Sequence, residues 1–287
     1  MSQGSITIEQ AATIPRVHVR SGVGENGRAR VSRDTAEKVI ALLAPVLLLA
    51  LWELLVRVRL LDARFFPAPL SIPGTFYNLA FVVPWQGALP NHVLTSLSRA
   101  AVGFAIGAIP AICIGIVMGL IPLVRAALQP IIGALFPIPK VAILPLLMLI
   151  FGLGEQSKWA IIAIGVFFQV LIATAAGVAN IERIYLDVGR NYGASRLATY
   201  RTIALPGALP MIFAGIRLGW GVALLLLVTA EMVSAKSGLG YLIWQSWQTF
   251  SVEEMYVGLV TVAGIGIVSF WLLDALESWL LPWKARS

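Results

Sequence analysis

Charged residues are scarce in this 287-residue chain, where Asp, Glu, Lys and Arg together make up 12% of the sequence. A soluble domain usually carries about 25% charged residues, so this chain cannot cover itself with polar surface. Apolar residues make up 59%, and the mean hydropathy is +0.87. Lipid must therefore be the main solvent of the chain, and little of it remains to build a water-soluble core.

Cysteine and histidine are nearly missing as well. Cys113 is the single cysteine and lies in an apolar run, which excludes an intramolecular disulfide and a cysteine metal cluster. The two histidines are His18, in a polar N-terminal segment, and His92, which we expect in a loop. This argues against a histidine zinc site and a Ser/His catalytic arrangement, so we expect neither metal nor cofactor on the chain.

The net charge of +7 raises the question of whether the chain binds nucleic acid. The basic residues form no patch with interleaved aromatic side chains, and they gather instead at the ends of apolar spans. Such placement is typical of the positive-inside rule of membrane proteins. The sequence thus predicts a lipid bilayer as partner and no nucleic acid.

The apolar runs predict an all-α, polytopic bundle, because a membrane helix needs about 20 mostly apolar residues. Residues 1–38 are polar and are expected to be a disordered cytoplasmic tail, since no signal-peptide core precedes residue 39. A transmembrane domain over 39–281 and a short cytoplasmic tail, 282–287, follow. The expected spans are 39–56, 98–120, 128–152, 158–180, 207–231 and 256–281.

The third span is interrupted by Pro137, Pro139, Lys140 and Pro145, which predicts a broken helix or two shorter membrane segments. Broken helices in a bilayer normally face protein or a water-filled cavity.

Six spans would place both termini in the cytoplasm. The basic residues agree with this orientation, because the tail, Arg125, the 181–206 loop and the C-terminal end would all lie inside. Arg57, Arg59 and Arg64 are exceptions that fall outside.

Small residues recur every four positions in the second span. Such stripes let helix backbones approach closely, within the subunit or against a second copy. The stripe consists of Gly103, Gly107, Ala111, Gly115 and Gly119, and Gly215 and Gly219 repeat the spacing in the fifth span.

The loop 182–206 is the longest and most basic internal loop between spans. Its apolar residues predict two short amphipathic helices at the membrane surface, with Gly193 at the turn between them. Ser195 can cap the second helix, and Pro206 ends it. The alternative is a plain basic helix that binds lipid headgroups.

This loop resembles the signature E-A-A-x3-G-x9-I-x-L-P of ABC importer permeases. Gly193, Ile203, Leu205 and Pro206 match it, while Asp187, Val188 and Gly189 stand where the acid and the two alanines are expected. The first position thus keeps its acidic character, and both alanines are replaced. Further segments over roughly 65–281 resemble the taurine, aliphatic-sulfonate and nitrate branch of the family, among them PIPKVAILPLLMLIFGLGEQSKW and AEMVSAKSGLGYLIW.

The resemblance implies a type I ABC importer fold and a subunit of an ATP-driven importer in the inner membrane of a prokaryote. It implies as partners two cytoplasmic ATP-binding subunits, a second permease copy and an extracytoplasmic solute-binding protein. ATP and Mg would be bound by the partner ATPase, because the chain has no G-x4-G-K-[ST] phosphate loop. The residues implied in coupling are Asp187, Arg190, Gly193, Ala194, Ser195, Arg196, Ile203, Leu205 and Pro206. A small anion, a sulfonate, taurine or nitrate, is the implied cargo.

Two charges lie inside or near the end of the fifth span. Arg217 is flanked by long uncharged stretches, and Glu231 lies roughly 21 Å further along a helix, too far for the two to pair. An intramembrane charge faces the bundle interior or a wet cavity. Arg217 could line the translocation path, or it could bind carbonyls or a carboxylate and steady the bundle or gate, which is the interpretation we favour.

Two other classes of function remain. An intramembrane enzyme is disfavoured because the spans contain no histidine, no paired aspartates and no nucleophile motif. An ion-coupled carrier or channel would use Arg217, Glu231 and the broken third span, and would not need residues 182–206.

Overall fold

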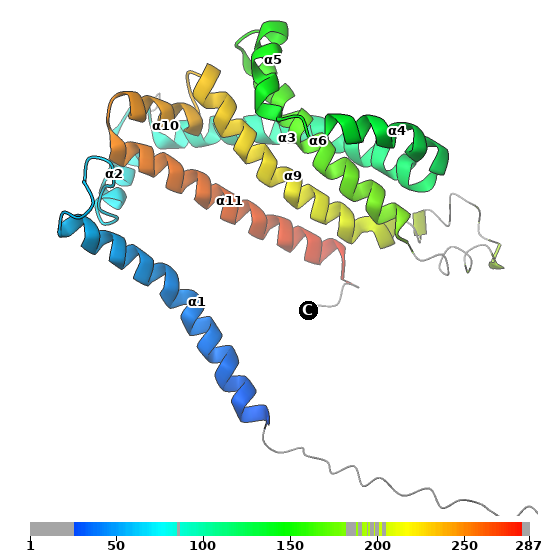
Figure 1. Ribbon diagram of the computed structural model, residues 1–287, viewed down its shortest axis with the longest axis horizontal. Helices are drawn as coiled ribbons and strands as arrows, with labels where there is room; N and C mark the ends of the chain where they lie inside the picture. The colour runs from blue at the N-terminus through cyan, green and yellow to red at the C-terminus, as the bar shows by residue number, and fades with distance from the viewer. Residues whose placement is uncertain are drawn as a thin grey trace, which may run out of the picture. The chain divides into compact units, whose positions relative to one another are not determined.

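The computed structural model is built of helices, and no strand occurs among the residues it describes (Figure 1). Those residues are 26–84, 87–181, 188, 191–193, 195, 198, 201–202 and 205–282, without the side chains of 26–38 and 42. The chain divides into two compact units, 1–54 and 55–287, and each is described by itself. The expected all-α class is confirmed.

Within the described ranges, five helices are long and apolar enough to cross a membrane. They coincide with the predicted first, second, fourth, fifth and sixth spans. Their bounds are α1 (Asn26–Arg57), α3 (Leu89–Leu120), α6 (Glu155–Ala179), α9 (Leu205–Ser234) and α11 (Val252–Leu280).

Helix α1 begins earlier than the sequence suggested. Residues 26–38 were expected to belong to a disordered tail, yet they are helical, and only Val39–Arg57 is apolar enough to span. Seven of these 13 residues are Arg, Ala, Glu or Lys, which favour a helix, so the helix of the apolar span extends into its polar flank without a break.

The predicted third span contains a break at its prolines. Helix α4 (Pro122–Leu135) is followed by a 3-10 turn (Lys140–Ile143) and helix α5 (Leu144–Phe151), with a bend of 83°. Pro137 and Pro139 lie between α4 and the turn, where they supply no backbone N–H and disfavour the helical conformation of the preceding residue.

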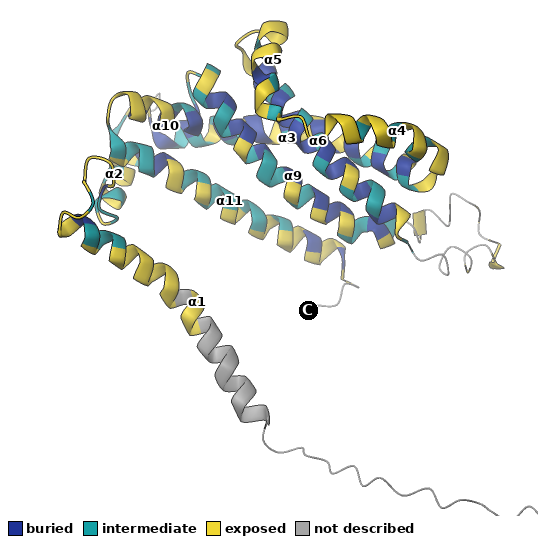
Figure 2. Ribbon diagram, viewed as in Figure 1, coloured by how far each residue is buried: buried dark blue, intermediate teal, exposed yellow. Residues whose placement is uncertain are grey.

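The core of the second unit lies where α3, α6 and α9 pack together, and Figure 2 shows the buried residues concentrated on these helices. Small residues make this packing close. A Cβ atom built on Gly103 would lie 2.7 Å from the Ile162 Cβ, and one on Gly115 would lie 2.7 Å from the Thr174 Cβ. Ala111, in the same stripe, is fully buried.

Helix α6 also packs against α9. Cβ atoms built on Gly215 and Gly219 would meet α6 residues, and one on Gly177 of α6 would lie 2.6 Å from the Met211 Cβ. The sequence left open whether the small-residue stripe packs within the subunit or against a second copy. The structure shows that it packs against α6 of the same subunit.

Leucine in place of Gly115 is expected to lower the stability of the subunit by about 1–3 kcal/mol, because α3 would have to move away from α6. The measurement is the apparent melting temperature of the purified protein in detergent. Gly264→Leu on α11 is the matched control, since a Cβ atom there meets no atom within 4 Å. Equal melting of the two variants would contradict close packing at Gly115.

The end of the bundle at which α3 and α6 begin and α9 ends is here called the α10 end. The segments between the predicted spans at this end contain helices, namely α2 (Ile72–Tyr77), a π-helical turn (Asn78–Val82) and α10 (Leu239–Gln248). The prediction of a loop at His92 is wrong, because α3 already begins at Leu89 and His92 is buried. A separate apolar cluster, in which Leu79, Leu89, Leu242 and Val257 meet, explains why these segments fold.

Candidate functional site

The predicted coupling segment, 182–206, is described only in part. Gly193, Ser195, Leu205 and Pro206 belong to the described residues. Five of the predicted coupling residues lie outside them: Asp187, Arg190, Ala194, Arg196 and Ile203.

Gly193 has the backbone of a turn that favours glycine. Its φ of 72° lies in the left-handed region, which side chains with a Cβ atom rarely adopt. Gly193 is exposed, and a Cβ atom on it would meet nothing within 4 Å. The Oγ of Ser195 accepts a hydrogen bond of 3.2 Å from the Ala198 N–H, which is the predicted cap.

The segment leads directly into α9. Leu205 and Pro206 form the start of this helix, where proline is tolerated because the first N–H groups have no helical partner. Helix α9 has 30 residues, which corresponds to about 45 Å. A displacement of the segment would therefore act on a rigid element that reaches the α10 end.

A network of polar groups, all of them buried except the exposed Glu155, lies at the α10 end and is here called the Glu231 cluster; it comprises Ser96, Arg99, Glu155, Glu231 and Gly240. Arg99 and Glu231 have side-chain exposures of 5% and 0%, and Arg99 Nη1 lies 2.8 Å from Glu231 Oε1. The remaining oxygen, Oε2, accepts hydrogen bonds from Ser96 Oγ at 2.8 Å and from the Gly240 N–H at 2.9 Å. The buried carboxylate is thus surrounded by donors, as a buried charge requires.

The same guanidinium binds a second carboxylate. Arg99 Nε and Nη2 donate to the two oxygens of Glu155 at 2.6 and 2.7 Å, in the bidentate geometry that makes such pairs strong. Arg99 Nη1 also donates to the Ser237 carbonyl at 2.5 Å. One side chain of α3 therefore joins the start of α6, the end of α9 and the turn before α10.

The turn between α9 and α10 fits tightly over this cluster. The Gly238 N–H donates to His92 Nδ1 at 3.0 Å, and the Leu239 N–H donates to Ser96 Oγ at 2.8 Å. Gly238 has a φ of 115°, and a Cβ atom on it would collide with the Glu231 carboxylate. Glycine is needed there both for the backbone angle and for space.

The sequence placed Glu231 at an end of the fifth span but missed its partners. Arg99 and Ser96 were not singled out, and His92 was assigned to a loop. The available signal was weak: an arginine at the start of one span and a glutamate at the end of another, 132 residues apart.

Arg217, in the other half of α9, has carboxylate partners on α11. Its Nη2 lies 2.6 Å from Glu277 Oε2 and also binds Asp274 Oδ1. Asp274 and Glu277 are three residues apart and so share one face of α11. Arg217 and Glu231 do not pair with each other, in agreement with their predicted separation along α9.

Methionine in place of Arg217 is expected to lower stability by about 1–3 kcal/mol, because two carboxylates would lose their charged hydrogen-bond donor. The apparent melting temperature in detergent measures this loss. Arg217→Lys keeps the charge and should lose less. If Arg217→Met melted like the unsubstituted protein, the ion pairs would not stabilise the bundle.

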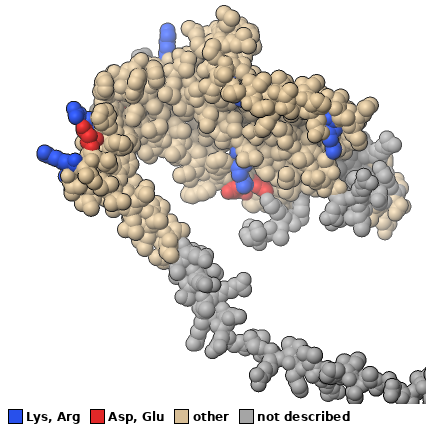
Figure 3. Space-filling model, in the orientation of Figure 1, with Lys and Arg blue, Asp and Glu red and all other residues tan. Residues whose placement is uncertain are grey.

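Charged side chains are otherwise rare on the face of the second unit shown in Figure 3, most of which is neither acidic nor basic.

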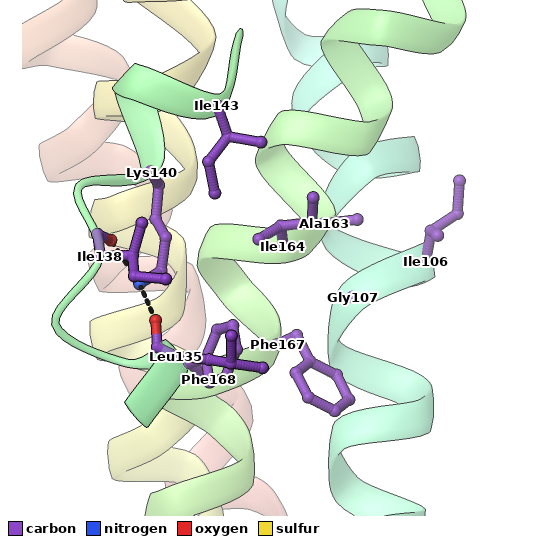
Figure 4. A pocket seen from close by; sticks show the side chains of 10 residues that line it. All are labelled: Ile106, Gly107, Leu135, Ile138, Lys140, Ile143, Ala163, Ile164, Phe167 and Phe168. Carbon is purple, nitrogen blue, oxygen red and sulfur yellow. Dashed lines mark hydrogen bonds between the residues drawn. The ribbon is translucent and has the colours of Figure 1, made fainter. Parts of the chain in front are cut away.

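A cavity of about 440 Å³ opens beside the break of the third span. It lies between α3, α6 and the segment 135–143, and Figure 4 shows Lys140 among apolar side chains. Its lining consists of Ile106, Gly107, Leu135, Ile138, Lys140, Ile143, Ala163, Ile164, Phe167 and Phe168.

Three cationic side chains donate hydrogen bonds to backbone carbonyls near the ends of helices. Arg125 Nη2 donates to the Gly119 carbonyl at 2.6 Å, Lys140 Nζ to the Phe136 carbonyl at 2.5 Å, and Lys158 Nζ to the Gly154 carbonyl at 2.9 Å. Gly119 lies in the last turn of α3 and Phe136 directly follows α4, where carbonyls lack a helical N–H partner, while Gly154 directly precedes α6. In a bilayer an unsatisfied carbonyl is costly, so each cation stabilises a sharp change of chain direction.

Comparison with known proteins assigns the chain to a family. Residues 111–282 match the family "Binding-protein-dependent transport system inner membrane component". The matched range includes the segment 182–206.

The chain belongs to this family of transport permeases.

Relatives of this permease cover nearly its whole length. The taurine transport permease TauC of Escherichia coli is 33% identical over 83% of this chain and 87% of its own. A putative aliphatic sulfonates permease, SsuC of Bacillus subtilis, is 32% identical over 96% of this chain and 97% of its own. The nitrate import permease NrtB of Leptolyngbya laminosa is 28% identical over 88% of this chain and 91% of its own. The permease is thus a membrane-embedded transport component of the branch that the sequence resembles.

The fold of the permease agrees with a solved transporter. The structure of the MetNI methionine ABC transporter, in an inward-facing conformation, matches with a TM-score of 0.56 and 17% identity. The match covers 70% of this chain and 99% of that chain. At this identity the likeness confirms the importer permease fold and does not identify a substrate.

Proposed function

We propose that the permease is the membrane-spanning subunit of an ATP-driven importer that moves a small anion into the cytoplasm. The observation that carries the proposal is the segment 182–206. Its G-x9-I-x-L-P spacing begins at Gly193, whose backbone is a left-handed turn, and ends at Pro206 in the first turn of α9.

The proposed complex contains two cytoplasmic ATP-binding subunits, two copies of the permease and an extracytoplasmic solute-binding protein. The description of the family names binding-protein-dependent transport, which supports the solute-binding protein. ATP and Mg would be held by the ATP-binding subunits and not by this chain.

The orientation is proposed from charge. The basic N-terminal segment, Arg125 and the basic loop 182–206 would face the cytoplasm, as the positive-inside rule demands. The Glu231 cluster and α10 would then lie at the outer surface of a prokaryotic inner membrane, with residues 39–281 as the transmembrane domain and both tails inside.

The proposed mechanism follows from the connection of 182–206 with α9. ATP-driven closure of the ATP-binding subunits would displace this segment, and α9 would transmit the displacement along its length. Because the Glu231 cluster and the close contacts of α6 fasten α9 to α3, α6 and α10, these helices would move together. Such rigid-body motion would alternate access to a central pathway.

The proposed cargo is an anion because the relatives are named for transport of taurine, aliphatic sulfonates and nitrate. An ion-coupled carrier is the competing function. It would use the charges within the membrane and would make no use of a docking segment.

Reconstitution of the purified complex in proteoliposomes separates these functions. We expect an ATP-binding subunit to co-purify with the permease, and uptake of taurine or an alkanesulfonate to require ATP on the side of that subunit. Ionophores that collapse ion gradients should leave uptake unchanged. Uptake that persists without ATP and stops with ionophores would establish the carrier instead.

A further inference from the structure

The cavity beside Lys140 combines one cation with apolar walls in the middle of a broken span. Such breaks place backbone and charge where substrates bind in many transporters. The volume of about 440 Å³ is within the range of small-molecule sites, roughly 300–1,000 Å³.

The charge of Lys140 is not balanced by a nearby carboxylate in the described part of the chain. Its Nζ donates to the carbonyls of Leu135, Phe136 and Ile138 at 3.3, 2.5 and 2.8 Å, and these neutral groups offset the charge only in part. By contrast, Arg99 and Arg217 each bind two carboxylates. Among these three cations, Lys140 therefore offers the most favourable electrostatic environment for an anion.

The walls of the cavity are apolar. Ile106 comes from α3, and Ile164 and Phe167 come from α6, while the Phe168 ring lies 4.8 Å from Lys140 Nζ (Figure 4). A ligand that fits this lining carries a negative head and an apolar tail. An inorganic anion would use the charge alone.

We propose that this cavity is a binding site for organic sulfonates within the translocation path, with the sulfonate near Lys140 and the alkyl tail against Ile106, Ile164 and Phe167. The proposal rests on the proposed function and extends it by naming the site and the ligand class. It also places the anion contact at Lys140 and not at Arg217, whose guanidinium binds two carboxylates.

The first test measures water access and charge in the cavity by thiol labelling. In a Cys113→Ser background, the permease in complex with its partners carries Ile164→Cys and is treated with an anionic or a cationic methanethiosulfonate. We expect both reagents to react, the anionic one about tenfold faster because of the nearby ammonium. Increasing salt should reduce this preference. Phe81→Cys, at an exposed position of the α10 end, is the control and should show no preference that depends on Lys140.

Substitutions of Lys140 test the source of the preference. Lys140→Met should abolish the preference for the anionic reagent, while Lys140→Arg should retain it. If Lys140→Met fails to fold because the carbonyls lose their donor, the salt dependence in the protein that keeps Lys140 decides the question. A cavity thiol that reacts with neither reagent, or with both alike, would overturn the proposal.

The second test measures the ligand class through protection of the Ile164→Cys thiol. Methane-, propane- and pentanesulfonate should slow labelling, with half-protecting concentrations that fall by about fourfold for each added methylene. Nitrate should protect weakly and pentylammonium not at all. Absence of protection by pentanesulfonate, or equal protection by pentylammonium, would contradict the site.

Failure of the site and failure of the proposed function give different results. Uptake that requires ATP, with a co-purified ATP-binding subunit and no protection by sulfonates, would remove only the site. Uptake that persists without ATP, with no ATP-binding subunit bound, would remove the function on which the site rests.

Discussion

Tryptophan in place of Gly193 is expected to lower ATP-dependent uptake by at least about tenfold. The φ of 72° costs about 1–2 kcal/mol for a residue with a Cβ atom, and the indole would occupy the exposed turn at which we propose an ATP-binding subunit docks. Loss of about 1.4 kcal/mol in the association equilibrium corresponds to a factor of ten. Uptake in proteoliposomes and the amount of co-purified ATP-binding subunit should fall together.

The controls separate docking from folding. A Cβ atom at Gly193 meets no atom within 4 Å, so Gly193→Trp should lower the melting temperature only by the backbone cost, and Gly193→Ala, which shares this cost without the indole, should melt at the same temperature but retain more bound ATP-binding subunit. Asparagine tolerates the left-handed conformation better than most residues, so Gly193→Asn should retain more uptake. Full uptake by Gly193→Trp with no ATP-binding subunit bound would refute the importer.

The second large effect is expected at the α10 end. Arg99→Met would leave Glu231 buried without its cation, and removal of one partner of a buried pair typically costs about 3–5 kcal/mol. The apparent melting temperature in detergent should drop strongly, and α10 should become more accessible to protease.

A double substitution identifies the cause. Arg99→Met combined with Glu231→Met removes both charges, and apolar residues of similar volume can replace a buried ion pair at little cost. The double variant should therefore be more stable than Arg99→Met alone, although Glu155, Ser96 and the Gly240 N–H also lose partners. Destabilisation equal to the sum of the two single variants would show that the two residues are not coupled.

The sequence predicted the helical class and most span positions because the requirement for about 20 apolar residues is local and depends little on packing. The same holds for the break at 137–140, where two prolines act on their own neighbours. Local physics also sufficed for the turn at Gly193 and the cap at Ser195. Counting apolar residues failed at 26–38 and 89–97. There the helices begin in polar residues that precede the apolar runs, so the predicted starts were too late.

The candidate site residues were predicted less completely. Arg217 was identified as an intramembrane charge, yet its partners Asp274 and Glu277 lie about 60 residues away on another helix. Lys140 was noticed only as an interruption of an apolar run. Its place on the wall of a cavity depends on α3 and α6, which the sequence of the third span does not reveal.

By itself, the sequence determined that this protein lies in a membrane, where its spans and its break fall, and that 182–206 has the form of a coupling segment. Composition and short-range spacing decide these properties. Only the tertiary structure decided which charges meet. Arg99, Glu155 and Glu231 come from three different helices, and Lys140 Nζ lies over the Phe168 ring beside the cavity at the break. Ion pairs and cavities form between helices distant in sequence, so their geometry follows from packing and not from any local pattern.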